Sequence, residues 1–261
     1  MTNSFQCTQC GQCCHDLNIP LTAKETIDWI SGGSPVKVLV EAIPWSEETV
    51  QDNELLKRKK QVTFAAFSGS LTIRVQVTFL GHFLGACPNL DAQRHCRIYE
   101  DRPLTCRIYP FEMSPHIALE PNNKLCPDEA WSLPKKTTAS IQQIPLQVSI
   151  IDPETDHHIQ TLFTQNTTDV AVKELLCRSL GIRSASLSND GYLFHHVNQN
   201  ELRSELQSLL SHTLKTTQNN GIQDWLIVSQ SDSTRSDLTQ IGGRTASLGN
   251  LTSQEEYLHF Q

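Results

Sequence analysis

Eight cysteines in the first half of this 261-residue chain constrain its fold more than any other feature. Most of the segment that carries the last four, from Gly81 to Cys126, is rich in Gly, Pro and Cys and shows little periodicity. Such a segment has few apolar positions with which to build a core, and bonds to a metal can replace one. The eight are Cys7, Cys10, Cys13, Cys14, Cys87, Cys96, Cys106 and Cys126.

The expected compartment decides how these thiols are interpreted. Residues 1–6 lack the basic and apolar regions of an export signal, and no apolar run approaches the roughly 18 residues that cross a bilayer. We therefore expect a cytoplasmic chain without a membrane span, whose thiols stay reduced and bind metal rather than form disulfides. The net charge of −7 argues against nucleic-acid binding, and the single basic run, at residues 57–60, is expected to be a solvated face.

The first four cysteines contain a metal-binding pattern. Cys7-x2-Cys10 has knuckle spacing, and Gly11 permits the tight turn that such a knuckle requires. Cys13 and Cys14 are adjacent, so in an extended segment they point in opposite directions, and one serves a second ion or faces away. The other four come from separate loops. The spacing leaves three possibilities open: two four-cysteine zinc sites, one dinuclear centre with shared thiolates, or an iron–sulfur cluster plus zinc.

Other residues near this pattern are weaker candidates. Cys177 lies among leucines in a helical pattern and is expected to pack in a core. Four histidines could each replace a thiolate, although each is more often a polar surface residue: His15, His82, His95 and His116.

The organisation of the chain indicates an α+β protein. Residues 1–134 are predicted to form an irregular cysteine-rich metal-binding domain with a β-hairpin, from 61–68 and 71–80, and short helices, one of them capped by Thr22 and Glu25. Residues 132–138 resemble a linker. A small α+β domain over 140–229 and a disordered tail over 230–261 are expected to follow.

The second domain is predicted from its order of elements. Residues 146–150 and 159–163 look like a hairpin around a turn at 152–156. A helix capped by Asp169 and ending at Gly181 follows, and then come strands at 192–194 and 225–228 and a helix at 200–214. This order is that of a β-grasp, or ubiquitin-like, domain.

Several motifs together resemble a known family. Cys-x2-Cys-x2-Cys-Cys at 7–14 is followed by Cys96-Arg97-Ile98-Tyr99, by Arg102-Pro103-x2-Cys106-Arg107 and by Tyr109-Pro110-Phe111. Over about residues 5–130 the chain is similar to the CxxCxxCC (YkgJ-like) family of zinc- or iron-chelating cysteine-cluster proteins. The resemblance implies a bacterial, cytoplasmic metal-binding domain of undefined role whose ligands are the eight cysteines. The related flagellin lysine N-methylases imply a protein lysine methyltransferase as the enzymatic alternative.

The residues themselves favour a metal-binding protein over an enzyme. Its cofactor is expected to be zinc or iron, the latter alone or in an iron–sulfur cluster. No catalytic residue and no glycine-rich nucleotide loop stands out. Two alternatives stay open, a methyltransferase or redox enzyme that uses the cluster, and an interaction module whose C-terminal domain binds a protein partner. Arg102 and Arg107 are expected to donate N–H groups toward the thiolates or to pair with Glu100 and Asp101.

Overall fold

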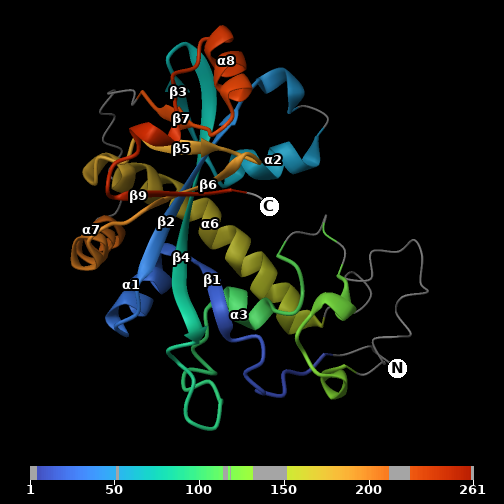
Figure 1. The fold of residues 1–261 in the computed structure, drawn as a ribbon. Coiled ribbons are helices and arrows are strands. Elements are labelled where there is room, and N and C mark those ends of the chain that lie inside the picture. The colour runs from blue at the N-terminus through green and yellow to red at the C-terminus, as the bar shows by residue number, and fades with distance from the viewer. Residues whose placement is uncertain are drawn as a thin grey trace. The chain divides into compact units, whose positions relative to one another are not determined.

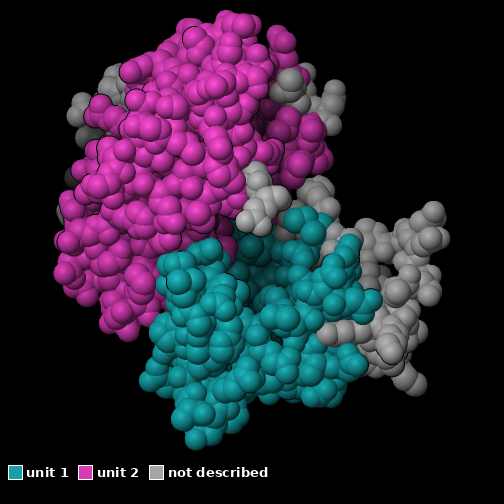
Figure 2. Space-filling view, viewed as in Figure 1, with its two compact units in different colours: residues 1–19, 82–164 teal, residues 20–81, 165–261 magenta. Residues whose placement is uncertain are grey.

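The computed structural model describes residues 5–50, 53–113, 117, 119–131, 152–211 and 224–259, and the fold is α+β as predicted. The chain divides into two compact units, coloured separately in Figure 2. Unit 1 combines residues 1–19 with 82–164, and unit 2 combines 20–81 with 165–261. The predicted linker at 132–138 lies outside the described residues, so the boundary near residue 134 stays a prediction. No helix in the described ranges is long and apolar enough to cross a membrane.

Nine strands of the described residues form one sheet, which is the main feature of the fold (Figure 1). β4 pairs with β2 antiparallel along nine residues, from Val36↔Gly81 to Pro44↔Ile73. The other side of β2 is shared by β6, at Val38–Val40, and by β5, at Glu41 and Ala42. The strands are β1 (His15–Leu21), β2 (Val36–Pro44), β3 (Phe64–Ser68), β4 (Leu71–Ala86), β5 (Ser184–Leu187), β6 (Gly191–His195), β7 (Leu226–Val228), β8 (Thr245–Ala246) and β9 (Glu255–His259).

Short sequence patterns predict several elements of unit 2 correctly. α1 (Ala23–Ser31) begins with a capping box, because the Thr22 hydroxyl accepts from the Glu25 N–H and the Glu25 carboxylate accepts from the Thr22 N–H. β3 and β4 form the predicted hairpin, with Ser68 opposite Leu71 and Gly69 at a positive φ of 57°. α2 (Glu54–Gln61) carries the basic run and has no buried residue, as a solvated helix requires.

The predicted hairpin over 146–163 is wrong in its described part. Residues 146–150 lie outside the described residues, but 153–163 form the start of a long helix, α6 (Pro153–Ser179). The Asp152 carboxylate accepts from the N–H groups of Glu154 and Thr155, at 3.0 and 2.9 Å. Asp at the N-cap followed by Pro at the first helical position is therefore a helix start here and not the predicted turn.

Asp169 was also predicted wrongly, as the N-cap of a separate helix. It lies inside α6, where its carboxylate accepts from the N–H of Ala23, at 2.8 Å, in the first turn of α1. It therefore satisfies an N–H that has no partner within α1 itself. The predicted helix end at Gly181 is nearly correct, since α6 stops at Ser179 and Gly181 takes a φ of 68°.

The C-terminal residues 230–261 were predicted to be disordered, and in their described part they are ordered. They contain α8 (Asp232–Gln240), β8 and β9. β9 pairs with β6 over five residues, and Leu238 of α8 is buried. Backbone pairing with the sheet and an apolar cluster order this segment, because Ala246 packs with Leu193 and Val228 and is covered by Leu248, Leu251 and Tyr257.

The other elements predicted in the second half are present but join a shared sheet. Strands 192–194 and 225–228 correspond to β6 and β7, and helix 200–214 corresponds to α7 (Gln199–Ser211). Because β5 and β6 both pair with β2, the region predicted as a small β-grasp domain shares its sheet with a strand from the first half.

The described residues of unit 1 form little regular structure. It contains α3 (Leu104–Ile108), two short 3₁₀ helices at Pro121–Asn123 and Asp128–Ala130, and the first part of α6. Phe5 forms a β-bridge with Trp131, and their rings meet at 5.1 Å. A small apolar cluster supports these elements: Ile108, Phe111, Leu119, Ile159 and Leu162.

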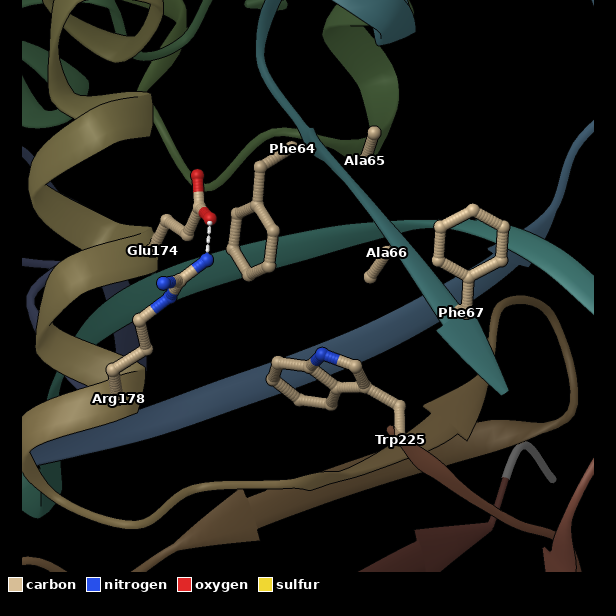
Figure 3. Close-up of a pocket in the computed structure, with 7 residues that line it drawn as sticks. All are labelled: Phe64, Ala65, Ala66, Phe67, Glu174, Arg178 and Trp225. Atoms are coloured by element: carbon tan, nitrogen blue, oxygen red, sulfur yellow. Dashed lines mark hydrogen bonds and ion pairs between the residues drawn. The ribbon is translucent and has the colours of Figure 1, made fainter. Parts of the chain in front are cut away.

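A small cavity of about 90 Å³ lies in unit 2 (Figure 3). Phe64 and Ala66 of β3 and Trp225 line it, and from α6 the ion pair of Arg178 with Glu174, at 2.6 Å, faces it. Its lining contains no cysteine, so this cavity is not the predicted metal centre.

Candidate metal centre

The first cysteines lie in a tight loop that ends where β1 begins. Gly11 adopts a φ of 67°, and its carbonyl accepts from the Cys14 N–H at 3.2 Å. The N–H of Gln9 points at Cys7 Sγ, at 3.4 Å. A backbone N–H aimed at sulfur partly neutralises a thiolate, as expected of a metal knuckle.

The close contact at Gly11 gives a testable prediction. A Cβ on Gly11 would lie 2.6 Å from the carbonyl oxygen of Arg94, whereas a Cβ on Gly85, with a similar φ of 74°, would meet no atom within 4 Å. Both alanine variants carry backbone strain, but only Gly11→Ala also forces two loops apart. We expect Gly11→Ala to lower the free energy of unfolding by about 2–4 kcal/mol and Gly85→Ala by about 1 kcal/mol. Equal losses in denaturant titrations would show that the contact with Arg94 is unimportant.

Four thiols from distant parts of the chain share one neighbourhood. The Cys87 N–H donates to the Cys14 carbonyl at 2.8 Å, and Cys96 bridges to Leu90, whose own N–H bonds to the Cys87 carbonyl. Each of the six pairs among four thiols is close enough for the two charges to interact. The four are Cys14, Cys87, Cys96 and Cys106.

The electrostatics of this group oppose ionisation without a cation. Burial first, and then the charges of the other thiols, raise the pKa of Cys87, Cys96 and Cys106. A hydrogen bond to Cys13, followed by burial, raises the pKa of Cys14. These thiols therefore stay protonated by themselves, and a bound cation is what would make the thiolate form favourable.

Cys13 and Cys126 share a second neighbourhood, around Tyr109. Burial raises the pKa of Tyr109 to about 12, and the charges of Cys126 and Cys13 add to the effect. The Tyr109 hydroxyl accepts from the Leu125 N–H at 3.0 Å and shares a hydrogen bond with Cys126. Tyr109 was known from the sequence only as a motif position, because nothing in its spacing shows that it lies beside two thiols.

Cys13 joins the two neighbourhoods. Its Sγ is 3.9 Å from that of Cys14, so the two side chains lie on the same side. Opposite directions were expected only for an extended segment, and residues 12–14 instead form a turn and a bend. Cys7 lies near the first group, where it interacts with Cys96 and Tyr99. Cys10 is half-buried in the same loop.

In the described residues, both predicted arginines donate to backbone carbonyls. Arg102 donates to the Tyr99 carbonyl at 2.7 Å and lies 3.6 Å from the centroid of the Tyr99 ring. Arg107 donates to the backbone carbonyls of Arg102 and Glu100, so these N–H groups hold the loop rather than a thiolate or a carboxylate. The charge of Arg102 still lowers the pKa of three thiols, Cys14, Cys96 and Cys106. The charge of Arg94 also lowers the pKa of Cys14. In the sequence, only the position of Arg94 next to His95-Cys96 indicates that it lies near the thiols.

The candidate histidines differ in their surroundings. His82 bonds to Asn18 at 2.8 Å, His95 faces Asp91 at 3.8 Å, and His116 lies outside the described residues. Nε2 of His15 is buried without a hydrogen-bond partner among the described residues. A buried nitrogen without a partner is costly, and a metal ion would relieve that cost.

The residues present fit a soft metal in kind and number. All nine cysteines lie in the described residues, and none is joined in a disulfide. However, no three cysteine, histidine, aspartate or glutamate side chains of the described residues stand close enough together to hold an ion. The thiols therefore share neighbourhoods without closing on one point, and the eight-cysteine ligand set stays a prediction. Cys177 is fully buried in unit 2, where burial raises its pKa to about 12, as expected of a core thiol.

Comparison with known proteins adds one finding. No curated protein and no solved structure matches the chain. The model of the CxxCxxCC family, described as a "putative zinc- or iron-chelating domain", matches residues 6–127, a range that contains all eight candidate cysteines and leaves out Cys177. Residues 6–127 therefore match the CxxCxxCC family, as the motifs of the sequence predicted.

Proposed function

We propose that this protein binds zinc or iron through its N-terminal cysteines and that the centre holds metal rather than catalyses a reaction. The observation that carries the proposal is the complete set of pairwise interactions among Cys14, Cys87, Cys96 and Cys106. Cys14, Cys87 and Cys96 come from loops and Cys106 comes from α3, so four soft-metal donors from separate parts of the chain share one neighbourhood. A bound cation would favour the thiolate form of all four.

The charges around the group support a thiolate-bound ion. Four thiolates on a divalent ion leave a net negative charge, and Arg102 and Arg94 lie close enough to offset it. A closed four-thiolate site has no open position for a substrate, and open positions are what metal catalysis uses.

Metal content tests this proposal. Full-length protein purified without oxygen is expected to contain zinc or iron, and Cys106→Ser is expected to lose at least one bound ion per chain because serine is a poor ligand for a soft metal. Cys177→Ala is the matched control, since it also removes a buried thiol but lies in unit 2. Elemental analysis gives the content, and an absorption spectrum separates coloured iron–thiolate centres from colourless zinc.

The opposite results would end the proposal. Wild-type protein without zinc or iron, and unable to take up either after reduction, would show that the thiols are not ligands. Equal metal content in Cys106→Ser and in the wild type would remove the four-thiol group from the site.

A further inference from the structure

The cavity in unit 2, of about 90 Å³, has no part in the proposed metal centre. Its wall is mostly aromatic, with Phe64 and Phe67 from β3 and Trp225 from the residue before β7. The ring centroids of Phe64 and Trp225 are 5.9 Å apart. Ala66 leaves room between them, and Phe67 is 38 % exposed, so the cavity is open to the surface (Figure 3).

One polar group in this wall is available to a ligand. Trp225 is fully buried, and its Nε1–H has no hydrogen-bond partner among the described residues. Figure 3 shows this nitrogen on the edge of the indole ring that faces Phe64 and Ala66. A buried N–H without an acceptor is costly, and a ligand with an acceptor atom would remove that cost. Trp45 differs, because its Nε1–H already donates to Glu47 at 3.2 Å.

The charges on the α6 side favour a neutral ligand. Glu174 and Arg178 lie one turn apart and form an ion pair at 2.6 Å, which faces the cavity (Figure 3). An anion in the cavity would meet the Glu174 carboxylate, and a cation would meet the Arg178 guanidinium, so either charge would be repelled. The carboxylate of Glu174 can still accept a hydrogen bond from a neutral group.

We propose that this cavity binds a small neutral primary amide, whose carbonyl oxygen accepts from the Trp225 Nε1–H and whose NH₂ group donates to Glu174. The size is appropriate, because a cavity of about 150 Å³ takes benzene and one of about 90 Å³ takes roughly four non-hydrogen atoms, as in acetamide. The methyl group would pack against Phe64 and Ala66. Since the cavity is open to the surface, the amide can also be the end of a larger molecule.

Nuclear magnetic resonance of the indole N–H groups tests this site. Full-length ¹⁵N-labelled protein, as purified in a reducing buffer, is titrated with acetamide, and Trp225→Phe identifies the Trp225 resonance. The Trp225 indole proton is expected to shift downfield and to saturate with a millimolar dissociation constant, because it gains an acceptor. The Trp45 resonance should stay in place, since that group already donates to Glu47. Acetate, an anion of the same size, should cause no shift.

Two variants test the roles of the wall. Glu174→Gln removes the negative charge beside Arg178, so it is expected to bind acetate about as well as acetamide. The Glu174 side chain is 34 % exposed, so this change should leave the fold intact. Ala66→Val fills the cavity and is expected to weaken acetamide binding about tenfold or more, while the Trp225 resonance remains visible.

The results that would overturn the proposal are distinct. No saturable shift of Trp225 with acetamide would remove the site, and an equal shift of Trp45 would show a general solvent effect instead. Acetate binding that is equal in the wild type and in Glu174→Gln would overturn the preference for a neutral ligand. If Ala66→Val does not fold, the acetamide titration of the wild type and the acetate titrations decide the question. Metal content is measured separately, so the proposed function does not depend on these outcomes.

Discussion

Removal of the metal with a chelator is expected to expose residues 87–106 to rapid hydrogen exchange while the sheet of unit 2 keeps its protection. The physical reason is that this segment holds three of the four grouped cysteines but only one short helix, α3, and no run of buried apolar residues. Where metal bonds stand in for a hydrophobic core, the free energy of metal binding is also the free energy of folding. Hydrogen exchange followed by mass spectrometry would measure the two regions in one sample.

The expected effect is large, and the chain contains its own controls. Apparent binding energies of structural zinc reach about 10 kcal/mol, so loss of the ion should bring exchange in this segment close to that of an unfolded chain. Peptides from β2 are the reference in unit 2, because β2 pairs with β4 along nine residues. Peptides from Ile159 to Leu162 should respond less than residues 87–106, since these two side chains lie in an apolar cluster. Unchanged exchange at 87–106 after complete removal of the metal would contradict the expectation.

Replacement of Lys173 by methionine is expected to change the pH dependence of stability. Lys173 is 4 % exposed in α6, where its ammonium donates to Asn166 at 3.1 Å and lies 5.7 Å from the Phe79 ring centroid. Burial lowers its pKa to about 8, although the charge of Asp169 partly opposes the shift. Methionine keeps the length and apolar character of the stem and removes the charge.

The direction of this pH dependence follows from how many protons the folded and the unfolded chain bind. Between pH 8 and about pH 10.5 the unfolded chain keeps the Lys173 proton more often than the folded chain does. The free energy of unfolding of the wild type therefore rises with pH in this window, and below pH 8 the full cost of the buried charge is present. A shift of this size corresponds to about 3 kcal/mol. The stability of the wild type relative to Lys173→Met should thus increase by about that amount from pH 8 to pH 10.5.

Urea titrations in a reducing buffer at several pH values would measure this difference. Subtracting the variant removes the contribution of groups that titrate equally in both proteins. Lys59→Met is the matched control, because Lys59 lies on α2, which has no buried residue. A difference for Lys173→Met that does not change with pH would show that Lys173 has an ordinary pKa in the folded protein.

Much of the local structure followed from short sequence signals. The capping box of Thr22 and Glu25 and the hairpin around Gly69 depend on contacts between residues only a few positions apart, so the sequence predicts them well. The start of α6 could have been predicted in the same way, from Asp152-Pro153. The order of the C-terminal segment could not, because it depends on pairing between β9 and a strand some 60 residues earlier.

The same distinction between local sequence and tertiary structure applies to the candidate site. The sequence by itself determined which residues are soft-metal donors, how many there are and which family they match, because these depend on residue type and spacing. Only the tertiary structure decided that Cys14 lies with Cys87, Cys96 and Cys106 while Cys13 lies with Cys126 and Tyr109. The reason is that the distance between thiols separated by tens of residues is set by how the intervening loops fold, and no spacing along the chain encodes it.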